Sequence, residues 1–213
     1  MSIRSLTVGP FQENTYLISD AGTNDAVLVD PGDEWERIVE LVRGAGVDLR
    51  AIWLTHGHID HIGAIAGLKR TWDVPVHLHD RDLPLYQAAD QQAAFYGIRF
   101  DTPPLPDASL SDGDIVKVGE QIFRVVHTPG HSPGHVIFVS DEAVIGGDLV
   151  FLDSIGRTDL PLSSPADMTR SLDRFARLDS SLALHPGHGP STTIARELQH
   201  NPFLNGMARV VRR

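Results

Sequence analysis

The sequence contains no cysteine and only two lysines, Lys69 and Lys117, among its 213 residues. Without cysteine, disulfides, thiolate metal ligands and a cysteine nucleophile are excluded. No segment approaches the roughly 20 apolar residues of a membrane helix, and the first residues lack a secretory signal, so we expect a cytoplasmic protein without a membrane partner. The net charge of −10 disfavours nucleic acid as a partner, because phosphate binding uses clustered Lys and Arg.

The composition is otherwise that of an ordinary globular protein, with 41% hydrophobic and 22% charged residues. A chain of 213 residues is long enough to bury a sizeable core, and we expect residues 1–213 to form one domain. The proline-rich stretch 102–106 is interpreted as a connection within that domain, because strand-like sequence resumes directly after it.

Apolar periodicity predicts strands and helices in both halves of the chain. Short apolar runs between Gly, Pro, Asn and Asp indicate strands, and apolar residues at helical spacing indicate helices. The expected strands are 3–8, 15–19, 26–29, 51–54, 74–78, 110–118, 122–127, 136–139, 143–145 and 181–185, and the expected helices begin near residues 35, 60, 80, 164 and 194. This order predicts an α/β protein whose two similar halves pack sheet to sheet.

A stretch rich in histidine follows the apolar run 51–54 and indicates a metal site. If the strand alternation continues, His56 and His58 point to one side and can share a cation. Asp60 and His61 come at the start of a predicted helix, where they can hold a second cation. A histidine-rich surface loop is the alternative, but four ligand-type residues in six positions disfavour it.

Three polar residues of the second half each follow a predicted strand. These are His131, Asp148 and His188, and glycine or proline flanks all of them. Side chains at strand ends can converge on one edge of a sandwich, so we expect these three to complete the site. Taken singly, each would be interpreted as a turn or loop residue. The nearby His135 and His185 lie in strand-like runs, and we expect them to form hydrogen bonds rather than to bind metal.

These residues together resemble a known ligand set. The pattern His-x-His-x-Asp-His at 56–61, followed in order by His131, Asp148 and His188, resembles that of the metallo-β-lactamase superfamily. Within it, the segments 128–135 and 147–148 are most similar to the glyoxalase II group, the hydroxyacylglutathione hydrolases, and 154–159 resembles their short bacterial relatives. The resemblance implies a four-layered αββα sandwich with a dinuclear metal site at one edge.

The resemblance also implies a role for each ligand. The first metal would be held by His56, His58 and His131, the second by Asp60, His61 and His188, and Asp148 would bridge the two. Neutral imidazoles and carboxylates suit zinc, iron or manganese, and zinc is our first expectation.

The expected chemistry follows from two cations that share a water molecule. Metal-bound water ionises near neutral pH and can attack a carbonyl group, and Asp60 is the nearest acceptor for its second proton. A thiol with a pKa near ~8.5 can leave without a general acid, which favours hydrolysis of a thioester such as S-lactoylglutathione. Full-length glyoxalase II enzymes bind glutathione with a C-terminal helical region; here Arg157 is the expected carboxylate anchor, unless it forms a surface salt bridge. Phe151 and Phe203 are each expected in the substrate pocket or in the core.

Three other functions stay open at this stage. A persulfide dioxygenase would hold one iron with His56, His131 and Asp148. A lactonase or β-lactamase would use the same dinuclear mechanism on another substrate. A non-catalytic metal-binding module is the third alternative, which the complete ligand set disfavours.

Overall fold

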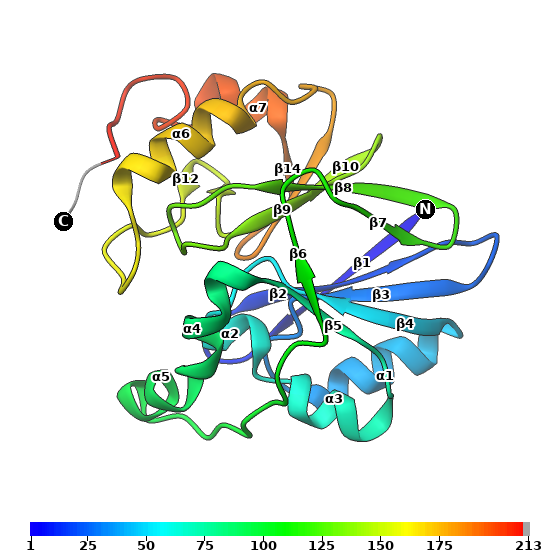
Figure 1. The fold of residues 1–213 in the computed structure, drawn as a ribbon. Helices are drawn as coiled ribbons and strands as arrows, with labels where there is room; N and C mark the ends of the chain where they lie inside the picture. The colour runs from blue at the N-terminus through cyan, green and yellow to red at the C-terminus, as the bar shows by residue number, and fades with distance from the viewer. Residues whose placement is uncertain (211–213) are drawn as a thin grey trace.

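Two six-stranded sheets lie face to face in the computed structural model, which describes residues 1–210 (Figure 1). The first sheet contains, in order, β1 (Ser2–Val8), β2 (Glu13–Ser19), β3 (Asp25–Val29), β4 (Asp48–Trp53), β5 (Val76–His79) and β6 (Ala108–Leu110). The second contains β14 (Thr192–Thr193), β13 (Ala183–Pro186), β10 (Ala143–Gly147), β9 (Val136–Val139), β8 (Gln121–His127) and β7 (Ile115–Val118). The short strands β11 (Val150–Phe151) and β12 (Ser154–Ile155) form a separate hairpin.

Helices cover the outer faces of both sheets (Figure 1). The first half contributes α1 (Trp35–Ala45), α2 (Ile59–Ile62), α3 (Ile65–Thr71), the 3-10 helix η1 (Asp80–Asp82), α4 (Leu83–Gln87) and α5 (Ala89–Tyr96). The second half contributes α6 (Pro165–Phe175) and α7 (Ile194–His200). The predicted αββα sandwich is therefore confirmed.

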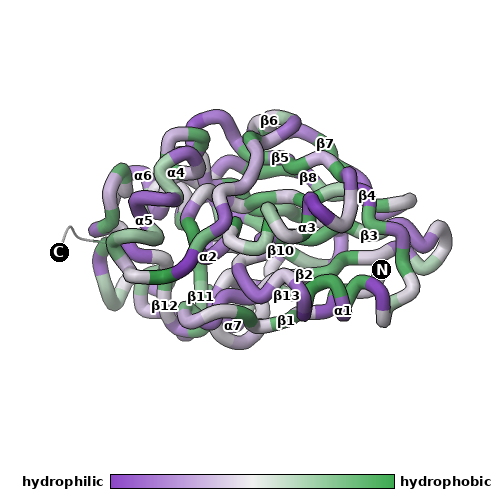
Figure 2. Tube along the Cα trace, turned by 90° about the horizontal axis from the view of Figure 1, so that it is seen from below, coloured by the Kyte–Doolittle hydropathy of each residue, from purple (hydrophilic) through white to green (hydrophobic). Residues whose placement is uncertain are grey.

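Buried apolar side chains of residues 1–210 form three clusters, one between each pair of adjacent layers. The middle cluster joins the sheets, and Trp53 of β4 contacts Phe123 and Phe138 of the second sheet at centroid distances of 5.6 and 5.2 Å. Such aromatic pairs each contribute about 0.5–1.5 kcal/mol beyond the burial of their area. Hydrophobic residues accordingly lie mostly along the inner strands, and hydrophilic stretches lie mostly in the outer loops and helices (Figure 2).

The strand expected over 110–118 is wrong as a single element. Leu110 ends β6 in the first sheet, and Ile115 begins β7 in the second. Between them the chain turns, with the Ser111 N–H donating to Asp114 Oδ2 at 2.7 Å and Gly113 at a φ of 87°. The run Ser111-Asp112-Gly113-Asp114 is typical of a turn and interrupts the apolar alternation, so the sequence itself contains a signal for two strands.

The helix expected over 60–72 is also divided, into α2 and α3. The Ala64 N–H donates to the carbonyl oxygen of Pro31 at 3.0 Å, outside the helical pattern. A Cβ at Gly63 would lie 2.3 Å from the Gly32 carbonyl oxygen, so the backbones of the two segments touch here. This contact ends α2 directly after the histidine-rich stretch.

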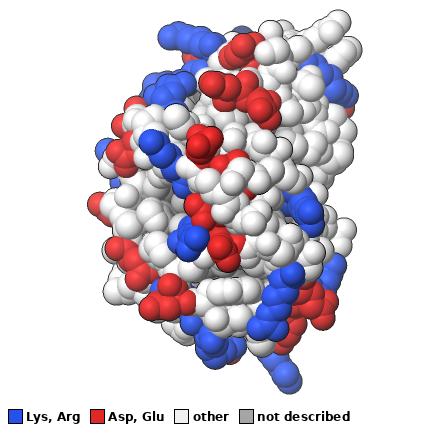
Figure 3. Space-filling view, turned by 90° about the vertical axis from the view of Figure 1, so that its right-hand side faces the viewer, with Lys and Arg blue, Asp and Glu red and all other residues white. Residues whose placement is uncertain are grey.

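The described residues contain no helix that combines the length and apolar character needed to cross a membrane. On the face at the right of Figure 1, acidic and basic side chains are interspersed (Figure 3). Among the described residues, neither sign of charge forms a continuous surface on that face.

Candidate functional site

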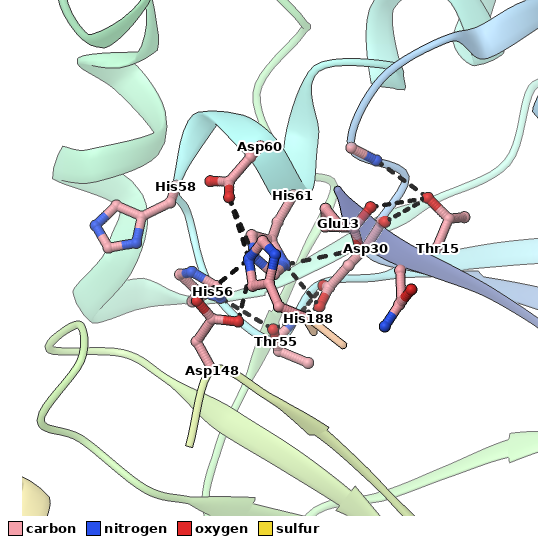
Figure 4. A network of polar contacts seen from close by, with 12 residues as sticks. Glu13, Thr15, Asp30, Thr55, His56, His58, Asp60, His61, Asp148 and His188 are labelled. Atoms are coloured by element: carbon pink, nitrogen blue, oxygen red, sulfur yellow. Dashed lines mark hydrogen bonds and ion pairs between the residues drawn. The ribbon is translucent and has the colours of Figure 1, made fainter. Parts of the chain in front are cut away.

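Four strand ends bring the predicted metal ligands to one edge of the sandwich. β4 is followed by His56, β8 by His131, β10 by Asp148 and β13 by His188. The two sheets are also joined here, because the Asn14 N–H at the start of β2 donates to the Gly187 carbonyl oxygen at 2.8 Å. All seven predicted ligands lie in this region, and Figure 4 labels all of them except His131, with His58 to one side of the others.

The first group consists of His56, His58 and His131, whose ligand-type atoms lie within 4.8 Å of one another. Their side chains are buried, with 0%, 8% and 4% of their surface exposed. His58 Nδ1 lies 2.9 Å from His131 Nε2, although 73 residues separate the two in sequence. We call this group the first triad.

The second group, which we call the second triad, consists of Asp60, His61 and His188 and meets the same 4.8 Å limit. Asp60 Oδ2 lies 3.8 Å from His61 Nε2 and 3.3 Å from His188 Nε2. The side chains of Asp60 and His188 are 19% and 25% exposed. This triad therefore contains a carboxylate and is open to solvent, unlike the first.

Asp148 lies between the triads and faces both with its carboxylate. Its Oδ2 is 3.4 Å from His131 Nε2 in the first triad. Its Oδ1 is 3.5 Å from His61 Nε2, and its Oδ2 is 3.6 Å from His188 Nε2. This is the position that a bridging ligand requires.

In four of the histidines predicted as ligands, the ring nitrogen Nδ1 has a hydrogen-bond partner. His56 Nδ1 lies 3.0 Å from Thr55 Oγ1, and His61 Nδ1 lies 3.1 Å from Asp30 Oδ2. The remaining two partners are carbonyl oxygens, that of Arg157 at 2.9 Å from His131 Nδ1 and that of Phe11 at 3.1 Å from His188 Nδ1. Metal-binding histidines characteristically have such partners, which orient the ring and leave its second nitrogen free.

A cation fits the centre of this arrangement. Among the described residues, His56 Nε2, His61 Nε2 and Asp148 Oδ1 are buried and have no hydrogen-bond partner. Buried polar atoms without partners are costly, and all three face the same space. Nitrogen and oxygen donors in this number suit divalent transition metals.

The electrostatics of the two triads differ. Burial lowers the pKa of His58 to about 3 and that of His131 to about 4, so both are neutral near pH 7, the form that binds metal. Burial opposes the charge of His61 and His188 as well, but the neighbouring Asp60 and Asp148 raise the pKa of both. The second triad therefore carries protons that a cation would displace.

The predicted substrate-binding residues have different surroundings. Phe151 packs edge-on against His188 with the ring centroids 5.8 Å apart, so it lines the site. The Arg157 side chain is 64% exposed and pairs with Asp159 at 2.9 Å, while its carbonyl oxygen holds His131. Phe203 packs against the cluster under α6 and belongs to the core.

Sequence reasoning missed Asp30, which fixes two parts of the site. Its carboxylate accepts the Thr55 N–H at 2.7 Å and the Thr55 hydroxyl at 2.6 Å, besides contacting His61. The signal was available, since Asp30 follows β3, the parallel neighbour of β4. His135 forms hydrogen bonds as expected, with its Nε2 accepting the Asp148 N–H at 3.0 Å.

Several known proteins are similar to this chain in sequence and in fold. The hydroxyacylglutathione hydrolase GloC of Haemophilus influenzae is 35% identical, with 96% of this chain and 99% of the relative covered. The crystal structure of TTHA1623 in a di-iron-bound form is 46% identical, with a TM-score of 0.88 over 94% of this chain and 100% of that one. The crystal structure of ETHE1 from Myxococcus xanthus is 28% identical, with a TM-score of 0.82 over 97% of this chain and 85% of that one.

The family model of the metallo-β-lactamase superfamily matches residues 8–188, the range that contains all seven predicted ligands. The match runs from the end of β1 to His188 and so covers strands β2 to β13. Together with the fold and the relatives, this match shows that the chain belongs to the metallo-β-lactamase superfamily.

Proposed function

We propose that this protein hydrolyses thioesters, with S-lactoylglutathione or a related glutathione thioester as its substrate and two divalent cations as cofactors. The observation that carries the proposal is Asp148, whose carboxylate lies 3.4 Å from His131 in the first triad and 3.5 Å from His61 in the second. The named activity of the GloC relative, which is similar over nearly its full length, supports the substrate class. Zinc is the first metal we propose, and the two irons of TTHA1623 make iron the second.

The cations would supply an ionised water as nucleophile and would polarise the carbonyl oxygen of the substrate. Asp60 is placed to hold a proton from that water, because burial opposes its charge but His61 and His188 lower its pKa and keep it ionised. The thiol product needs no acid to leave, since its pKa is near ~8.5. Phe151 would form an apolar wall beside His188, and Arg157 would bind a substrate carboxylate at the rim.

A mononuclear iron oxidoreductase is the alternative that uses part of the same ligands. It would require His56, His131 and Asp148 only, and it would leave the second triad without a role. The inward-facing nitrogens of His61 and His188, each with its other nitrogen fixed, support the dinuclear proposal over this one.

The experiment compares substrates on protein loaded with zinc or with iron. Metal-free protein is loaded with each metal, and its metal content is measured. Cleavage of S-lactoylglutathione, a glutathione-free thioester and a lactone is then followed, together with oxygen consumption in the presence of glutathione persulfide. We expect two cations per chain and preferential cleavage of the glutathione thioester. Oxygen consumption without thioester cleavage would overturn the proposal in favour of the oxidoreductase.

A further inference from the structure

Asp82 is a buried carboxylate that the chemistry above does not use. It lies at the end of η1 and is 0% exposed. A buried carboxylate is costly unless hydrogen bonds compensate for its lost hydration. Its partners therefore indicate what it stabilises.

The donors to Asp82 come from two loops that carry metal ligands. Its Oδ2 accepts the Gly57 N–H at 2.9 Å and the Ser132 hydroxyl at 2.6 Å. Its Oδ1 accepts the N–H of Gly134. Gly57 stands between His56 and His58, whereas Ser132 directly follows His131. One side chain thus joins both loops of the first triad.

The backbone at Asp82 fills the space between the same loops. A Cβ at Gly57 would lie 2.9 Å from the Asp82 carbonyl oxygen, and a Cβ at Gly134 would lie 2.7 Å from the Asp82 nitrogen. Both approaches are too close for any residue with a side chain unless the backbone shifts. The two loops consequently cannot move relative to each other without disturbing Asp82.

We propose that Asp82 is a positioning residue for the first triad, which sets the distance between His58 and His131 by holding their loops together. The second triad depends on other partners, namely Asp30 for His61 and the Phe11 carbonyl oxygen for His188. Asp82 therefore affects the affinity of one cation much more than that of the other. The inference rests on the metal centre of the proposed function and is independent of the substrate.

The test measures each triad separately with Co²⁺ as the probe. In a His188→Ala background only the first triad is complete, and in a His56→Ala background only the second. Metal-free proteins are titrated with Co²⁺ against a chelator, and the visible spectrum of bound Co²⁺ is recorded. Adding Asp82→Asn should weaken Co²⁺ binding about 10- to 100-fold in the first background, because the loss of a residue that orients metal ligands typically has this effect. It should also alter the visible spectrum of the bound Co²⁺. In the second background the change should be less than about 3-fold, because the oriented partners of that triad are intact.

Asp20→Asn is the matched control. Asp20 is also buried, at 5% exposure, and also joins two segments, accepting the N–H of Gly22 at 3.2 Å and that of Glu120 at 2.8 Å. It lies beyond the end of β2 that is remote from the site. Asp20→Asn should lower thermal stability without changing Co²⁺ affinity in either background.

The outcomes separate this inference from the proposed function. The role of Asp82 would be overturned if Asp82→Asn weakened Co²⁺ binding equally in both backgrounds. It would also be overturned if Co²⁺ binding in the first background did not change. If Asp82→Asn does not fold, Ser132→Ala is used instead, because it removes one hydrogen bond to Asp82. It should weaken Co²⁺ binding in the His188→Ala protein by about 3- to 10-fold. An unchanged Co²⁺ affinity would then overturn the inference. Wild-type protein that holds two cations but cleaves no thioester would overturn the proposed function alone.

Discussion

The two triads of the candidate metal centre differ in both donor chemistry and exposure. The first consists of three imidazoles, none more than 8% exposed, and burial holds His58 and His131 neutral by lowering their pKa. In the second, Asp60 and His188 are 19% and 25% exposed, and His61 and His188 have raised pKa values. If the site binds two cations, as we propose, we expect the first triad to hold its cation more tightly and the cation of the second triad, beside Phe151, to meet the substrate.

Asp148→Ala should have the largest effect, because it removes the one side chain that faces both triads. We expect turnover to fall by more than about 100-fold, beyond the range for outer partners of metal ligands, and both cations to bind more weakly. Metal content after dialysis and the rate of thioester cleavage measure this. If Asp148→Ala kept two cations per chain, the bridging role would be wrong.

His56→Ala and His188→Ala each remove one donor, the first from the first triad and the second from the second triad. His56→Ala removes a fully buried donor and should abolish turnover together with tight binding of the first cation. His188→Ala changes the exposed triad, so we expect one cation to remain bound and a small residual turnover. Metal analysis of both purified variants is the measurement, and similar metal content in the two would show that the triads are equivalent.

Lowering the pH should separate the triads without any mutation. His61 and His188 have raised pKa values, so below those values a cation must displace protons, and its affinity falls as pH falls. The expected loss is about tenfold per pH unit for each proton displaced. His58 and His131, with pKa values of about 3 and about 4, should keep the first cation at constant affinity from pH 8 to about 5. Chelator titrations at several pH values test this, and parallel losses at both sites would contradict it.

The part of the site that could be predicted from sequence is the part that is local or follows a strand. His56 to His61 are nearly contiguous, and His131, Asp148 and His188 each follow an apolar run, so these side chains can converge at one edge of the sandwich. Their assignment to one ligand set depends on the resemblance to the superfamily. Sheet membership was harder, because the turn sequence at 111–114 separates two short strands but does not show that they join different sheets.

The residues that sequence could not assign act across long separations. Asp30 contacts His61 from 31 residues away, and Asp82 contacts Ser132 from 50 residues away. Aspartate at either position is also typical of a turn or a helix start. Asp30 follows a strand, as the predicted ligands do, but no such signal marks Asp82. Only the packing of the loops brings these carboxylates into contact with His61 and with the residues beside the predicted ligands.

Arg157→Ala should have the smallest effect, and it tests where the exposed triad meets the substrate. Truncating the side chain leaves the carbonyl oxygen that holds His131 Nδ1 at 2.9 Å, so the metals and the turnover number should change little. The guanidinium pairs with Asp159 at the surface, where such an ion pair contributes no more than about 1 kcal/mol. We therefore expect the KM for S-lactoylglutathione to rise by about 3- to 10-fold, the effect of losing one charged hydrogen bond to the substrate. Asp159→Asn is the control, since it frees the guanidinium and should lower KM if Arg157 binds a carboxylate. An unchanged KM in Arg157→Ala would remove this residue from the substrate site and would leave Phe151 as its only proposed contact.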